Sequence, residues 1–107
     1  MSQETPLVVF TTVGAVHDAE RLARDLVERQ LVACVNIIDQ VRSVYRWQGE
    51  IQEDAEKLLV IKTLPDKLEE LTERLHAIHP YDVPEFVVIE SHSVSKKYGK
   101  WLVDALR

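Results

Sequence analysis

The sequence is short of residues that small proteins often use for stabilisation or chemistry. Its 107 residues include one cysteine, Cys34, so no disulfide can form within the chain. The only glycines, Gly14, Gly49 and Gly99, are too scattered to form a loop that cradles phosphate. No Cys-x-x-Cys or His-x-x-x-His pair marks a metal site. Stability must therefore come mainly from the burial of apolar side chains.

Long apolar runs and an excess of positive charge are also missing. No run approaches the roughly 20 apolar residues of a membrane-spanning helix, so we expect no membrane partner. The formal net charge of −5 argues against nucleic acid as a main partner. Residues 1–6 are polar, and we expect a flexible N-terminus rather than a signal peptide. With its lone cysteine, the chain is expected to be cytoplasmic.

The pattern of apolar residues predicts a single α+β domain over residues 1–107. The expected elements are a strand at 7–10, a helix at 16–30, strands at 33–47 and 50–63, a helix at 64–78, a strand at 85–89 and a helix at 95–106. Thr11, Thr12 and Gly14 are expected to end the first strand, and the last strand is expected to be buried. The order is that of a ferredoxin-like βαββαβ sandwich with an extra C-terminal helix, in which two helices cover one face of an antiparallel sheet.

The second and third strands are predicted to form an unusually long hairpin that residues 43–49 close. Gln48-Gly49 is a tight turn, because glycine supplies the positive φ that such turns need. The numbers of two paired residues should then add up to 97, so that Trp47 faces Glu50. A bulge at Asp39-Gln40 would shift the inner pairs by one. Arms of about 14 residues would span roughly 45 Å, whereas such a domain has a radius of gyration of about 13 Å.

The outer part of this hairpin carries four large apolar side chains, Val44, Tyr45, Trp47 and Ile51. Left exposed, they would promote aggregation. Two interpretations stay open: the hairpin folds back on its own sheet, or a second copy of the chain covers it. We favour self-association.

Several motifs, in order, resemble those of the CutA family of divalent-cation tolerance proteins. They are LVACVNII at residues 31–38, SVYRWQGEI at 43–51, IKT at 61–63, HPYDVPE at 79–85 and the closing Tyr98-x-x-Trp101-Leu102. The resemblance implies a non-enzymatic homotrimer linked to tolerance of copper and other divalent metals. It also implies an arrangement like that of PII-type signalling proteins, so the alternative is a trimeric sensor that binds a small ligand in intersubunit clefts. At residues 90–94 the chain has ESHSV, where many members have a proline and a later glycine.

The resemblance also indicates where a metal ion would bind. Some members are described as holding copper through a cysteine on the first strand and histidines before the Pro-Tyr pair. Here the corresponding positions hold Thr11 and Ile78, which leaves His79 as the one candidate ligand. No cofactor is required, and copper or another divalent metal ion is the candidate ligand. Cys34, within an apolar strand, is expected to be a buried and inert core residue.

The remaining candidate residues are expected at a subunit boundary. The two prolines of HPYDVPE make a stiff connection that could present Tyr81 and Glu85 to a neighbouring hairpin. Tyr98 and Trp101, spaced i and i+3, are expected to pack in the core or at an interface. The full set is Tyr45, Arg46, Trp47, Glu56, Lys62, Tyr81, Glu85, Tyr98 and Trp101. These residues could be interface contacts or could line a small-molecule pocket. An enzyme using the same clefts ranks last, because the sequence offers no paired acid and base.

Overall fold

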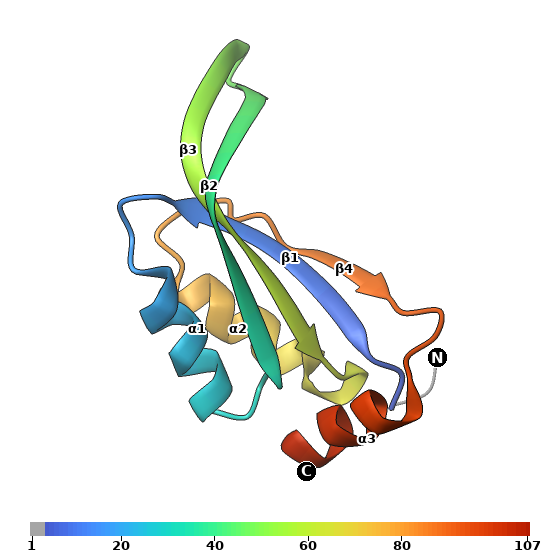
Figure 1. Cartoon of the computed structure of the whole chain (residues 1–107). Helices are drawn as coiled ribbons and strands as arrows, with labels where there is room; N and C mark the ends of the chain where they lie inside the picture. The colour runs from blue at the N-terminus through green and yellow to red at the C-terminus, as the bar shows by residue number, and fades with distance from the viewer. Residues whose placement is uncertain (1–3) are drawn as a thin grey trace.

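A four-stranded antiparallel sheet, in the order β2-β3-β1-β4, is the frame of the computed structural model, which describes residues 4–107. The elements are β1 (Leu7–Gly14), α1 (Ala19–Glu28), β2 (Cys34–Trp47), β3 (Glu50–Thr63), the 3-10 turn η1 (Pro65–Lys67), α2 (Leu68–Ile78), β4 (Val87–Glu90) and α3 (Lys96–Ala105). Figure 1 shows α1 and α2 against one face of the sheet and α3 beyond its lower end. The predicted ferredoxin-like arrangement with an added C-terminal helix is therefore confirmed.

The main core lies between the sheet and the two helices. Alternate side chains of β1, including Leu7, Val9 and Val13, are buried, as the period of a strand requires. Leu26 of α1 and Leu75 of α2 pack into the same cluster. A smaller second cluster holds α3 against the end of the sheet through Leu64, Leu102 and Leu106. Among residues 4–107, no helix has the length and apolar character of a membrane span.

Two predicted boundaries near the N-terminus were wrong. Strand β1 continues through Thr11 and Thr12 to Gly14, because threonine is β-branched and fits an extended chain. Helix α1 begins only at Ala19, since the Asp18 side chain caps it by accepting a hydrogen bond from the Arg21 N–H at 3.0 Å. Of the N-terminal residues expected to be flexible, 1–3 lie outside the described part of the chain.

The long hairpin has the predicted turn and register. Trp47 pairs with Glu50, and inside a shift between Ile38 and Val41 the pairs move by one, so that Cys34 faces Lys62. Gln48 and Gly49 both have positive φ, 49° and 81°, as in a type I′ turn. Each arm has 14 residues.

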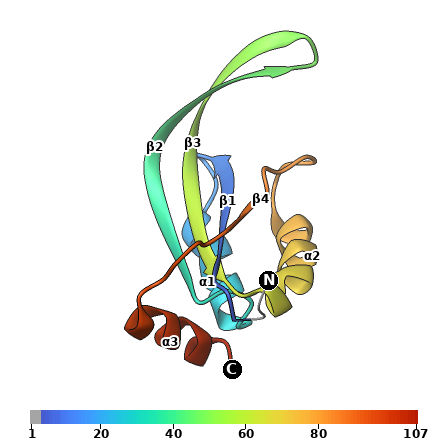
Figure 2. The same ribbon diagram turned by 90° about the vertical axis from the view of Figure 1, so that its right-hand side faces the viewer.

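The hairpin projects beyond its own domain. Figures 1 and 2 show its outer half curving away above the sheet without returning to it, and the longest extent of the molecule is 44 Å. Its apolar residues stay exposed, Val44 at 64% and Ile51 at 62%. Within one chain, the hairpin does not fold back on its own sheet.

In the described part of the chain, the face of the sheet opposite α1 and α2 carries apolar side chains that are partly or fully exposed. The register places Val8 and Phe10 of β1 beside Ile89 and Val87 of β4 on this face, with Val60 of β3 on their other side. Neither Figure 1 nor Figure 2 shows a described helix over it. We call this surface the open sheet face. Strand β4 was expected to be buried, but it is an exposed edge strand because no other strand of residues 4–107 pairs along its outer edge.

Candidate functional site at the base of the hairpin

The site begins where the hairpin leaves the sheet. Pairing between β1 and β3 ends at Gly14 and Glu56, and the backbone N–H of Ala15 donates one more hydrogen bond to the Ala55 carbonyl at 3.0 Å. The β2 bulge lies across from the same point, with Val41 paired to Glu56. Beyond it, β2 and β3 continue as a ribbon of two strands. We call this point the hinge of the hairpin.

Tyr81 reaches the hinge from the connection between α2 and β4. Its hydroxyl donates a hydrogen bond to Glu56 Oε2 at 2.7 Å, and Glu56 is only 6% exposed. Burial, followed by the bond to Glu56, raises the pKa of Tyr81 well above its usual range, so the phenol keeps its proton. A neutral donor thus satisfies a buried carboxylate.

His79 anchors the start of the same connection. Its Nδ1 accepts a hydrogen bond from the Tyr81 N–H at 3.0 Å, and its Nε2 lies 2.8 Å from the Thr12 carbonyl oxygen. These partners assign the tautomer with the proton on Nε2, which donates to Thr12. Burial lowers the pKa of His79, which favours the neutral ring. The imidazole packs edge-on against Tyr81, with ring centroids 4.8 Å apart.

A second pair of a tyrosine and a carboxylate lies farther out on the hairpin. The Tyr45 hydroxyl donates to Asp54 Oδ2 by a short hydrogen bond, and this contact raises the pKa of Tyr45. The sequence argument missed Asp54. The register could have shown it, because Tyr45 pairs with Gln52 and Asp54 follows two residues later on the same face.

Other candidate residues are dispersed in a single chain. Arg46 donates to the Gly49 carbonyl at 3.3 Å at the tip, next to Trp47. Glu85 is exposed on the connection before β4. Lys62 lies near the C-terminal end of β3, away from the hinge at Glu56, and donates a hydrogen bond to Asn36 Oδ1. One chain therefore unites Glu56 with Tyr81 but leaves Lys62 apart from them.

The aromatic pair of α3 lies at the surface. The rings of Tyr98 and Trp101 are 5.4 Å apart, and both residues are more than two-fifths exposed. Core packing of this pair is therefore excluded within one chain, and an interface remains a proposal. Cys34, near Tyr98, is half-buried rather than fully buried, because its side chain belongs to the uncovered side of β2.

The described residues do not form a preformed metal site. Among residues 4–107, no three His, Cys, Asp or Glu side chains are grouped so that they could hold an ion. Both nitrogens of His79 are already used by Thr12 and Tyr81. His76 Nδ1 contacts the Thr72 carbonyl at 2.7 Å. The donor set thus does not fit a resident copper ion, which prefers several imidazole or thiolate ligands.

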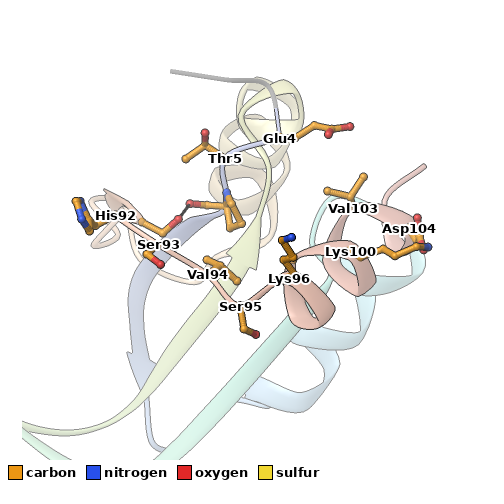
Figure 3. A pocket seen from close by; sticks show the side chains of 13 residues that line it. Glu4, Thr5, His92, Ser93, Val94, Ser95, Lys96, Lys100, Val103 and Asp104 are labelled. Atoms are coloured by element: carbon orange, nitrogen blue, oxygen red, sulfur yellow. Dashed lines mark hydrogen bonds and ion pairs between the residues drawn. The ribbon is translucent and has the colours of Figure 1, made fainter.

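A surface hollow of about 480 Å³ lies at the start of α3 (Figure 3). Its wall includes residues 91–94, part of the stretch that departs from the CutA pattern. Ser91 binds the Pro6 carbonyl at 2.7 Å, and Lys100 pairs with Asp104 at 2.6 Å. The polar groups of Ser91 and Lys100 at the wall of this hollow are thus bound to other groups of the same chain.

Comparison with known proteins agrees with the motifs and the fold. The family profile described as "CutA1 divalent ion tolerance protein" matches residues 7–105. The chain belongs to this CutA1 family. A divalent-cation tolerance protein CutA of Thermus thermophilus is 45% identical over 95 residues, which cover 89% of this chain and 92% of that protein.

Plant CutA proteins are similarly close. A chloroplastic CutA of Arabidopsis thaliana is 44% identical over 101 residues, 94% of this chain but 56% of that protein. The chain thus spans little more than half the length of that relative. The crystal structure of CutA1 from Oryza sativa matches with a TM-score of 0.91 and 42% identity over 97% of each chain. The family and its fold are therefore established for this chain.

Proposed function

We propose that the chain works as a non-enzymatic homotrimer linked to tolerance of divalent metals such as copper, in the cytoplasm. The observation that carries the proposal is the bare apolar surface of the single chain, on the hairpin and on the open sheet face. Relatives named for divalent-cation tolerance support the biological role.

The open sheet face supports the assembly. Apolar side chains from three strands gather there, among them Phe10, Val60 and Ile89, and Ile89 is 46% exposed. Contiguous apolar patches of this kind usually mark an interface. Copies packed through this face would bury it, and the hydrophobic effect would favour that burial.

The hairpin supports the same conclusion independently. Within residues 4–107, no further strand pairs with the outer part of the hairpin, which also exposes Val44 and Ile51. A strand edge of this kind accepts a strand from another chain. Donation of each hairpin to the next copy in one rotational sense generates a ring when the rotation between copies closes, and the family resemblance implies three copies.

The alternative is a PII-like trimeric sensor with a small ligand in the clefts between subunits. One observation favours the sensor: Lys62 lies apart from Glu56 and Tyr81 in a single chain. A cleft lined by all three residues would therefore need a second copy of the chain. A ligand there would act by changing the contacts of the hairpin. Under both proposals, the metal-tolerance trimer and the PII-like sensor, copper would bind weakly at surface histidines.

Light scattering at micromolar concentration tests the assembly. The expected molar mass is that of three chains, and a monomer would rule the proposal out. A host that lacks its own copy of the gene tests the role in tolerance. Copper(II) survival should be restored by the wild type and not by a variant that stays monomeric.

A further inference from the structure

We propose that His79 and Tyr81 form a hydrogen-bonded brace that fixes the angle of the hairpin, and that His79 is a positioning residue rather than a metal ligand. The brace belongs to the single chain. Its consequence for assembly rests on the proposed function, because a trimer needs every hairpin to leave its domain at the same angle.

The hinge needs an external support. A ribbon of two strands is only marginally stable alone, and β1 stops pairing with β3 at Gly14 and Glu56. The β2 bulge at the same level leaves Gln40 with a φ of 61° and interrupts the ladder. The pairing of β1 with β3 and the regular ladder between β2 and β3 are thus both interrupted at the place where the direction of the hairpin is set.

The brace supplies a continuous chain of three hydrogen bonds across this point. His79 Nε2 donates to the Thr12 carbonyl of β1 at 2.8 Å, and His79 Nδ1 accepts from the Tyr81 N–H at 3.0 Å. The Tyr81 hydroxyl then donates to Glu56 of β3 at 2.7 Å. The segment that follows α2 is thereby hydrogen-bonded to β1 through His79 and to β3 through Tyr81.

Gly14 makes room for the brace. A Cβ atom at this position would lie 3.3 Å from the Tyr81 hydroxyl and 3.2 Å from Cδ2 of His17. These distances are tighter than ordinary van der Waals contact. The absence of a side chain at position 14 therefore lets the Tyr81 hydroxyl approach Glu56 over the end of β1.

The same geometry removes His79 from metal binding. A metal ion needs a ring nitrogen with a free lone pair. The Nδ1 lone pair accepts from the Tyr81 N–H, and Nε2 carries the proton donated to Thr12. Additional copies of the chain could not free these atoms, so ligation would require the brace to break.

Hydrogen exchange on the full-length protein tests the brace. Tyr81→Phe removes one hydroxyl, and Tyr98→Phe is the matched control, since within residues 4–107 its hydroxyl has no hydrogen-bond partner. Loss of a hydrogen bond to a charged group should speed exchange over residues 41–58 by about tenfold in Tyr81→Phe, with the helices unchanged. Unchanged exchange there, or an equal increase throughout the chain, would overturn the brace.

A zinc titration of the wild type, followed by ¹⁵N NMR of the histidine rings, tests whether His79 is a positioning residue rather than a metal ligand. The His79 shifts should report a proton on Nε2 and should stay constant while those of exposed His17 and His92 move. Movement of the His79 nitrogens with less than one equivalent of zinc would overturn its assignment as a positioning residue. Light scattering of the same samples reports the number of subunits separately, so failure of the brace and failure of the trimer are distinguishable.

Discussion

Replacing Thr11 with valine is expected to stabilise the protein. Thr11 is 0% exposed, and its Oγ1 has no hydrogen-bond partner within the described chain. Thr63 provides a matched control on the same sheet. It is also 0% exposed, but its Oγ1 donates to the Leu31 carbonyl at 2.7 Å. The two threonines differ in hydrogen bonding and share the same burial.

The expected magnitudes follow from that difference. A buried polar group without a partner costs about 1–3 kcal/mol. Valine keeps the shape of threonine, so Thr11→Val should gain an amount within that range. Thr63→Val instead loses a hydrogen bond worth about 1 kcal/mol and leaves the Leu31 carbonyl without its partner, so it should lower the free energy of unfolding by about 1–2 kcal/mol.

Urea denaturation of the wild type and both variants measures these changes. All samples need the same protein concentration, because assembly makes apparent stability depend on it. The midpoint should rise for Thr11→Val and fall for Thr63→Val, with unchanged slopes. A fall for both variants would mean that the Thr11 hydroxyl has a partner, and would refute the reasoning.

Three further changes have expected outcomes. Gln30 has a φ of 57° at the end of α1, where the Leu31 N–H bonds to the Leu26 carbonyl at 3.1 Å, so Gln30→Gly should stabilise the protein by about 1 kcal/mol in urea melts. A loss of stability would show that the hydrogen bond from Gln30 Nε2 to the Ala105 carbonyl at 3.4 Å matters more. Burial chiefly lowers the pKa of His79. The hydrogen bond to Thr12 and the charge of Glu56 oppose this shift, whereas nearby His17 and His76 act in the same direction as burial. The unfolded chain then binds the proton more readily, so this contribution is present above about pH 6.5 and is lost as the pH falls through the lowered pKa. His79→Gln should flatten the dependence of the urea midpoint on pH between 5 and 8, and an unchanged slope would contradict this assignment. Trp47→Glu places a charge on the exposed hairpin and should weaken assembly by about tenfold or more in dilution light scattering; an unchanged trimer would make Trp47 peripheral.

The hairpin was predictable because local chemistry determines it. Gln48-Gly49 specifies a tight turn, and a turn of known length fixes every pair outward from it. The interruption of the apolar pattern at Asp39-Gln40 located the bulge. These inferences needed neither distant contacts nor a second chain.

The errors arose where tertiary context decides. Thr11 and Thr12 are polar, yet they continue β1 because β3 pairs with them. The apolar run in β4 indicated burial, but in a single chain it lies at an exposed edge. Cys34 was misjudged for the same reason. An apolar strand does not reveal whether its partner surface belongs to the same chain.

The candidate site was predicted in part. Tyr81 was expected to face the hairpin of a neighbouring copy, with Glu56 as a companion at the subunit boundary. It instead donates a hydrogen bond to Glu56 of its own chain, 25 residues away in the sequence. His79 was selected as a potential ligand from the motif resemblance. Its role depends on what Nδ1 and Nε2 contact, which only the folded chain reveals.

Native mass spectrometry with and without copper(II) and zinc(II) tests the proposed assembly most directly, because it reports the number of chains and of bound ions together. The predicted spectrum is dominated by three chains without metal, with no stoichiometric ion retained after metal is added and excess removed. A dominant monomer would contradict the assembly. A trimer retaining a fixed number of copper ions would contradict the absence of a resident metal site.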